Sequence, residues 1–185
     1  MEARFFHRDP KLVARELLGM TLVRRLDGKE YRGRIVETEA YYSSGDPASR
    51  ARYGKKRYNA PMFDGAGHLF IYNVHKYWML NFTTLPVSAV LIRAVEPLNF
   101  EADTRGPGRL TMALRIDRSL NGLPLCNSTG VWVEPGKPPQ KLARSFRIGV
   151  TADLPEPLRF FDPESSWVSF PRKPVLVKVS QVEAN

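Results

Sequence analysis

The stretch that most constrains the fold is the run from Arg32 to Tyr41, which reads RGRIVETEAY. β-Branched and aromatic residues are frequent in this run, and the turn-forming pair Asp27-Gly28 lies just upstream. The run is therefore predicted to be a β-strand that returns from a hairpin turn. Because alternate residues of a strand share a face, Glu37 and Glu39 are expected about 7 Å apart on one face, together with Ile35.

The two carboxyl groups have two interpretations. Carboxyl groups in apolar surroundings tend to have a raised pKa, a like charge nearby adds to this effect, and such groups cluster at functional sites. Alternatively, Glu37 and Glu39 form ion pairs with some of the 28 lysine and arginine residues on a solvated face, without a catalytic role. The pattern alone leaves both interpretations open.

The composition limits the class of protein. A chain of 185 residues fits a single domain, here expected to span residues 1–185, and its 43% hydrophobic content is ordinary for a globular protein. The net charge of +9 favours a polyanionic partner, either nucleic acid or an acidic membrane surface. The single cysteine, Cys126, excludes an internal disulfide and a cysteine-rich zinc site, and it suits a reducing compartment.

No part of the sequence predicts insertion into a membrane. Charged residues interrupt the apolar residues near the N-terminus, so no signal peptide is expected, and no run approaches the roughly 20 apolar residues of a membrane span. We therefore expect a soluble intracellular protein, in the cytoplasm or nucleoid of a prokaryote or in the nucleus of a eukaryote.

The rest of the chain predicts many strands and few helices. One short helix is expected from Asp9-Pro10 to Gly19, and a second follows Gly106. The expected buried side of the first helix consists of Leu12, Val13, Leu17 and Leu18. Strand-like runs cover residues 21–26, 69–72, 77–82, 87–95, 131–133, 146–150, 158–161, 167–170 and 175–179, with a hairpin connection at residues 73–76. This balance predicts one α+β domain with a curved, mostly antiparallel, barrel-like sheet and a few peripheral helices.

A long loop is predicted over residues 43–67, which are rich in Ser, Gly, Pro, Arg and Lys and lack periodicity. Basic residues alternate with tyrosine over residues 50–58 of this loop. Such a run suits phosphates and the faces of bases, or it is only a solubilising surface. At the start of the second helix, free backbone N–H groups and the charge of Arg109 could bind a phosphate.

Several chemistries can be excluded. His7, His68 and His75 do not have the spacing of metal ligands, and the chain contains no Walker loop, dinucleotide fingerprint or nucleophile elbow. Cys126 has no neighbouring base in the sequence that would make it a nucleophile. What remains is a carboxylate on a strand of a basic, tyrosine-rich protein, which indicates acid–base chemistry on nucleic acid.

A series of motifs extends the run from Arg32 to Tyr41 through most of the chain, over about residues 5–170. In order, these motifs are Asp46, Met62-Phe63, Gly67-His-Leu-Phe-Ile-Tyr72, Trp78-Met-Leu-Asn81, Leu91-Ile-Arg93-Ala-Val-Glu-Pro97, Gly106-Pro-Gly-Arg-Leu-Thr-Met-Ala-Leu114, Arg147-Ile-Gly-Val150, Pro157-Leu-Arg-Phe160 and Ser166-Trp-Val-Ser169. In content and order, the series resembles the alkyladenine (3-methyladenine) DNA glycosylases, the mammalian-type monofunctional enzymes.

The resemblance implies an enzyme that flips alkylated or deaminated purines out of double-stranded DNA and cleaves their N-glycosidic bond, leaving an abasic site. It also implies one mixed α/β domain that acts as a monomer without a metal or cofactor. Glu39 matches the general base that activates a water molecule. Arg93 matches a residue that helps to hold this water.

The resemblance also assigns a base pocket. Tyr41 and Tyr72 match aromatic residues that stack on the two sides of the flipped base. Asn81 matches a pocket wall that rejects the exocyclic amine of guanine, and the backbone of Ile148 matches a segment whose N–H reads the base edge. The chain departs from the family at Arg50, where a histidine normally contacts the base edge.

A second departure concerns the DNA wedge. The family's hairpin tip usually carries a tyrosine that fills the gap left by the flipped base, but here the tip is about one residue shorter. His75 or Tyr77 is therefore expected to take this role. Lys76, Arg109 and Arg52 are expected to contact the DNA backbone.

Other interpretations of the same residues remain. Tyr72 and Asn81 could be core residues of a hairpin, and Arg93 could be a charge on an edge strand. A non-catalytic nucleic-acid-binding domain would explain the basic surface. A sugar glycosidase would use Glu37 and Glu39 as its acid pair, although neighbours on one face poorly suit a sugar held from two sides.

Overall fold

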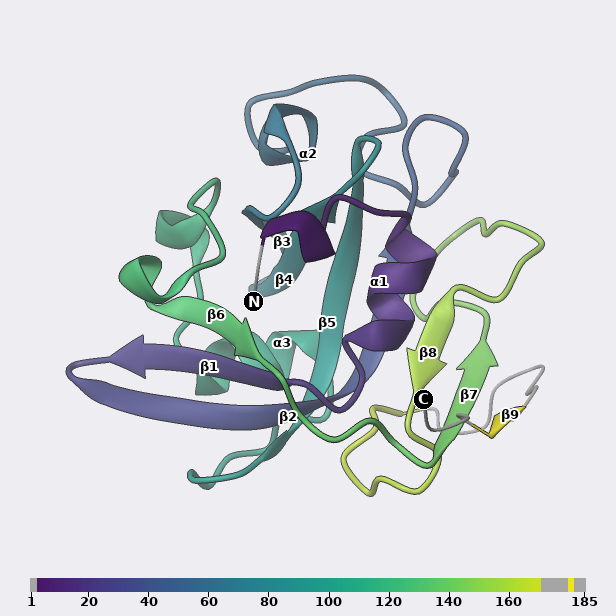
Figure 1. Ribbon diagram of the computed structural model, residues 1–185. Helices are drawn as coiled ribbons and strands as arrows, with labels where there is room; N and C mark the ends of the chain where they lie inside the picture. The colour runs from purple at the N-terminus through teal and green to yellow at the C-terminus, as the bar shows by residue number, and fades with distance from the viewer. Residues whose placement is uncertain (1–2, 171–179, 182–185) are drawn as a thin grey trace.

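The computed structural model describes residues 3–170 and 180–181 (Figure 1). In this part of the chain, nine strands form a sheet in the order β3-β4-β5-β2-β8-β7-β9, and β1 pairs with both β2 and β6. All of these pairings are antiparallel. The predicted α+β domain with a curved, mostly antiparallel sheet is confirmed. The strands are β1 (Thr21–Leu26), β2 (Lys29–Tyr41), β3 (Leu69–Val74), β4 (Tyr77–Thr84), β5 (Ser88–Pro97), β6 (Val131–Glu134), β7 (Lys141–Ser145), β8 (Arg159–Phe161) and β9 (Ser180–Gln181).

The helices are short. The α-helices are α1 (Pro10–Glu16), α2 (Pro61–Asp64) and α3 (Pro107–Ala113), and the 3₁₀ helices are η1 (Ala3–Phe5), η2 (Arg118–Leu120) and η3 (Asn127–Thr129). α1 packs on β2 and β5, and α3 packs on β4 and β5, so the main hydrophobic core lies around these central strands. None of the described helices is long and apolar enough to cross a membrane.

β2 is the strand on which the sheet is centred. One of its edges pairs with β5 over residues 33–41, and the other pairs with β1 over residues 29–34 and with β8 over residues 37–39. The register with β5 shifts on both sides of Glu37, and β-bulges of this kind bend a strand and increase its twist. Figure 1 shows β2 running from the β1–β2 turn across the molecule to the base of the 43–67 loop.

The first helix differs from its prediction in two details. Asp9 caps it as expected, since its carboxylate accepts the backbone N–H of Lys11 at 2.8 Å. The helix ends at Glu16 instead of Gly19, and Leu12 is 45% exposed. The other three predicted residues are buried, so the buried side of this segment is narrower than predicted.

The β3–β4 hairpin is tighter than predicted. The expected connection covered residues 73–76, but Val74 pairs with Tyr77, which leaves only His75 and Lys76 in the turn. His75 has a φ of 53°, in the left-handed region. The loop at residues 43–67 is confirmed, with the four-residue α2 inside it.

The C-terminal predictions are partly wrong. The runs at residues 146–150 and 167–170 are not strands, and β7 lies at Lys141–Ser145 instead. In both runs a backbone N–H donates to a buried carboxylate, so these segments do not enter the sheet as strands. The run at residues 175–179 lies outside the described residues.

Candidate active site

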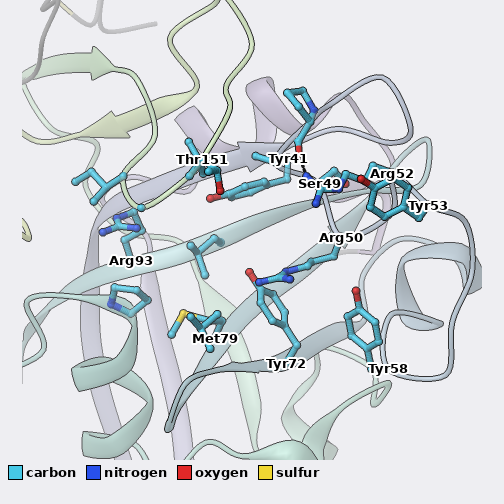
Figure 2. Close-up of a pocket in the computed structure, with 18 of the residues that line it drawn as sticks. Tyr41, Ser49, Arg50, Arg52, Tyr53, Tyr58, Tyr72, Met79, Arg93 and Thr151 are labelled. Carbon is cyan, nitrogen blue, oxygen red and sulfur yellow. Dashed lines mark hydrogen bonds between the residues drawn. The ribbon is translucent and has the colours of Figure 1, made fainter.

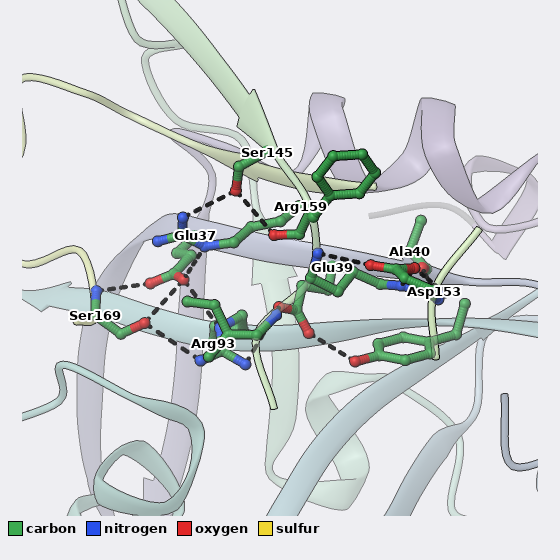
Figure 3. Close-up of polar contacts among 12 residues, drawn as sticks. Glu37, Glu39, Ala40, Arg93, Ser145, Asp153, Arg159 and Ser169 are labelled. Carbon is green, nitrogen blue, oxygen red and sulfur yellow. Dashed lines mark hydrogen bonds and ion pairs between the residues drawn. The ribbon is translucent and has the colours of Figure 1, made fainter. Parts of the chain in front are cut away.

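Glu37 and Glu39 are both fully buried in β2, so the solvated-face interpretation is wrong (Figure 3). Arg93 of β5 contacts both carboxylates: its Nε lies 2.9 Å from Oε1 of Glu37, and its Nη1 lies 3.3 Å from Oε1 of Glu39. Burial alone would lower the pKa of Arg93, but Glu39 and Glu37 outweigh it and raise this pKa. The guanidinium therefore remains charged and joins the two acids.

Glu37 has its acceptor positions filled. Its carboxylate accepts from Nε of Arg93, from Nε of Arg159 at 2.7 Å, and from the N–H and hydroxyl of Ser169 at 2.7 and 2.8 Å. Burial works to raise the pKa of Glu37, but the two arginines and these hydrogen bonds outweigh it and lower the pKa. The raised pKa expected from apolar surroundings is therefore wrong for Glu37, which acts as an ionised anchor.

Glu39 keeps acceptor capacity. Its Oε1 accepts the backbone N–H of Ile148 at 2.8 Å and contacts Arg93, and its Oε2 accepts the hydroxyl of Tyr41 at 2.7 Å. Burial and the charge of Glu39 raise the pKa of Tyr41, so the phenol stays protonated and donates. A carboxylate offers about four acceptor sites, so two hydrogen bonds and one ion pair leave capacity for a further donor, such as a water.

A cavity of about 550 Å³ is lined by residues that contact Glu39 (Figure 2). Its walls come from the end of β2, the 43–67 loop, strands β3 to β5, the start of α3 and residues 148–151. Glu39 does not line the cavity, but Tyr41, Arg93 and Ile148, which contact its carboxylate, do. Figure 2 shows Tyr41 and Tyr72 on different sides of this cavity, as expected for a pair of stacking residues.

Tyr72 has a neighbour on each face. The ring of Phe70 stacks on it with a centroid distance of 5.1 Å and an interplanar angle of 27°. The guanidinium of Arg50 lies over the ring with 4.6 Å between Cζ and the centroid. Because Phe70 is buried in the core and Arg50 lines the cavity, Arg50 covers the face of Tyr72 that is turned toward the cavity.

Arg147 connects three segments around Glu39, a role that the sequence interpretation missed. Its fully buried guanidinium forms a bidentate pair with Asp46 at 2.7 and 2.8 Å and donates to Asp153 at 2.6 Å. It also lies over the ring of Tyr41 at 4.5 Å and donates to the carbonyl of Ala40 at 3.0 Å. Arg147 therefore holds Tyr41 and the loop that carries residue 148, which supply the two hydrogen bonds to Glu39.

The two residues expected to act as the DNA wedge differ in how far they are packed against the rest of the protein. His75 is exposed at the turn of the β3–β4 hairpin. Tyr77 is half-buried against α3, where a Cβ added to Gly108 would lie 2.7 Å from its ring. Lys76 is exposed at the tip, with its Nζ over the ring of Tyr77 at 5.4 Å.

The two other expected phosphate contacts already have partners. Arg109 of α3 forms an ion pair with Asp103 at 2.8 Å, and Asp103 also pairs with Arg105 at 2.9 Å. Arg52 lies at the cavity mouth, over the ring of Tyr53 at 4.6 Å, and donates to a loop carbonyl.

Two groups that were expected to read the base already donate hydrogen bonds within the protein. Asn81 is buried in β4 and does not line the cavity, since its amide donates to the carbonyls of Phe70 and Met79 at 3.0 and 3.1 Å. The N–H of Ile148 donates to Glu39. Their base-reading roles stay predictions. Among the described residues, no cluster of His, Cys, Asp or Glu has a geometry that could hold a metal ion.

Comparison with known proteins identifies the family. The family model of methylpurine-DNA glycosylase matches residues 4–166. A relative from Aeropyrum pernix is 38% identical over 175 residues, which cover 89% of this chain and 90% of the relative. A relative from Methanocella arvoryzae is 39% identical over 186 residues, with coverages of 89% and 93%. Both carry provisional names as 3-methyladenine DNA glycosylases.

The chain belongs to the methylpurine-DNA glycosylase family. Its class is therefore that of the DNA glycosylases, hydrolases of base excision repair whose substrate is DNA.

Proposed function

We propose that this protein is a monofunctional DNA glycosylase that hydrolyses the N-glycosidic bond of an alkylated or deaminated purine in double-stranded DNA. The observation that carries the proposal is the buried carboxylate of Glu39, which is held by two hydrogen bonds and an ion pair from residues that all line the cavity. Such a fixed carboxylate beside an aromatic cavity suits a general base that acts on a flipped nucleotide.

The reaction follows from this geometry. Flipping the purine costs a few kcal/mol, and stacking on Tyr41 and on the Tyr72 side of the cavity recovers about 1–3 kcal/mol per contact. Glu39 takes a proton from a water whose oxygen bonds to C1′ of the sugar. The C1′–N9 bond breaks, and its electron pair leaves with the purine. Arg93 orients the carboxylate of Glu39 through their ion pair, in which Nη1 and Oε1 lie 3.3 Å apart.

On the DNA side, we assign the wedge to His75. It is the exposed residue at the hairpin turn, whereas Tyr77 is held against Gly108. Lys76, Arg52 and Arg109 then contact phosphates around the flipped nucleotide, and Arg109 must exchange Asp103 for a phosphate. The net charge of +9 suits this polyanionic substrate, on which we expect a monomer to act inside the cell.

The sugar-glycosidase alternative is disfavoured by Glu37. Two carboxyl groups must face the glycosidic bond in that mechanism, and one of them must donate a proton. Glu37 is ionised and buried, and its carboxylate already accepts four hydrogen bonds. It therefore cannot serve as that acid.

Release of free base from a duplex with a single hypoxanthine tests the proposal. We expect the free base and an alkali-labile abasic site, with no strand cleavage before alkali. Retention of the DNA without release of the base would instead support a non-catalytic nucleic-acid-binding domain.

A further inference from the structure

The cavity has an unbalanced charge. Four cationic residues line it, namely Arg50, Arg52, Lys56 and Arg93, and none of its lining residues is acidic. The charge of Arg93 is compensated by Glu37 and Glu39, which do not line the cavity. Arg50, Arg52 and Lys56 are all exposed on the 43–67 loop, where salt screens their charges. Of these three, Arg50 is the one whose guanidinium lies over the ring of Tyr72, so its charge bears most directly on a base that enters the cavity on that side.

The position of Arg50 is defined by Tyr72 and Phe70. Phe70 covers the core-side face of Tyr72, and the guanidinium of Arg50 covers the cavity-side face. A base that enters this side of the cavity meets the flat guanidinium before it meets the tyrosine ring. Guanidinium groups stack on planar rings and only donate hydrogen bonds, so Arg50 can serve as a charged stacking surface.

We propose that Arg50, stacked on Tyr72, makes this enzyme selective for damaged purines that are neutral in DNA over purines that carry a positive charge. This inference rests on the proposed base-release activity and specifies its substrate class. Hypoxanthine represents the favoured class, since it is neutral and presents O6 and N7 as acceptors. A purine alkylated at N3, such as 3-methyladenine, is cationic in DNA and meets the like charge of Arg50 in the cavity.

The movement of electrons during bond cleavage also favours neutral purines over cationic ones. When the C1′–N9 bond breaks, its electron pair stays on the purine. A neutral purine therefore departs as an anion until it takes a proton from solvent, whereas an N3-alkylated cation departs as a neutral base. A fixed cation beside the ring stabilises the developing negative charge of the first class and gives the second class no such benefit.

Single-turnover excision of hypoxanthine and of 3-methyladenine, placed in duplexes of the same sequence, tests this selectivity. We expect the wild type to release hypoxanthine at least as fast as 3-methyladenine, although the cationic base is intrinsically the better leaving group. In Arg50→Gln, the ratio of the hypoxanthine rate to the 3-methyladenine rate should fall about tenfold or more. Arg50→Lys, which keeps the charge, should stay within about threefold of the wild-type ratio.

A matched control separates selectivity from DNA affinity. Arg52→Gln removes a neighbouring cation that lies over Tyr53 at the cavity mouth, so it should slow both reactions together and leave their ratio unchanged. Equal ratios in the wild type and in Arg50→Gln, with both bases still released, would overturn the role of Arg50 and leave the proposed function intact. Failure of the wild type to release either base would refute the proposed function itself.

Discussion

The backbone N–H of Ile148 donates a 2.8 Å hydrogen bond to the carboxylate of Glu39, which lies 109 residues earlier in the chain. The preceding residue, Arg147, is fixed by Asp46 and Asp153 and lies over Tyr41. The orientation of the proposed general base therefore depends on a loop that has no place in the sheet.

We predict that Asp153→Asn slows base release about tenfold and leaves binding to DNA with an abasic-site analogue within about threefold of wild type. Asp153 accepts from the backbone and guanidinium of Arg147, so its loss frees the loop that holds Ile148, and a displacement of about 1 Å can cost up to a hundredfold in rate. Single-turnover rates and filter binding measure the two effects.

Glu134→Gln is the matched control for this variant. Glu134 also accepts from an arginine, Arg32, at 2.6 Å, but it lies on β6 and contacts none of the cavity residues. Its substitution should leave the release rate within about twofold, as is usual for an ion pair at the surface. An equal loss of rate in both variants would show that Asp153 has only a general structural role.

The elements of the fold that depend on residues close together in the sequence could be predicted. Residue alternation and the Asp27-Gly28 turn are local signals, so the strand that carries Glu37 and Glu39 and the face they share follow from the sequence. The pair formed by Arg147 and Asp46 could not be predicted, because its members are 101 residues apart and no spacing links them. Strand propensity failed at residues 146–150 because the N–H of Ile148 serves a carboxylate there.

Glu37→Gln should lower the free energy of unfolding by about 3–5 kcal/mol at pH 7, because it leaves two buried arginines without their shared anion. The folded-state pKa of Glu37 lies below its ordinary value of 4.5. The stabilisation is therefore complete above pH 4.5 and is lost as the pH falls through the folded-state value.

Urea unfolding of the wild type and Glu37→Gln at pH 7, 5 and 3 measures this difference. We expect equal differences at pH 7 and 5 and a smaller one at pH 3. A difference below about 1 kcal/mol at pH 7 would contradict the role of Glu37 as the buried anchor.

His75→Ala should reduce excision from a duplex about tenfold and change excision from a single strand by less than about twofold. Only a duplex has a gap to fill after the base leaves the stack. Tyr77→Ala should instead lower the melting temperature, since Tyr77 packs on Gly108. Normal duplex activity in His75→Ala, with a large loss of duplex activity in Tyr77→Ala, would move the wedge to Tyr77.

Asp103→Asn should tighten binding to undamaged DNA and steepen its salt dependence. Asp103 holds Arg105 and Arg109, and its loss makes both cations available to phosphates. Each added phosphate contact increases the slope of log K against log salt by about 0.9. Titrations at several salt concentrations measure the slope, and an unchanged slope would show that α3 does not face the DNA backbone.

Base release by Glu39→Gln tests the proposed chemistry most directly. The change is nearly isosteric and removes the proton acceptor, so release of hypoxanthine should fall by about 10²–10⁴-fold. Affinity for DNA with an abasic-site analogue should stay within about threefold of wild type, because the cavity walls are unchanged. Equal excision by Glu39→Gln and the wild type would contradict the assignment of Glu39 as the general base.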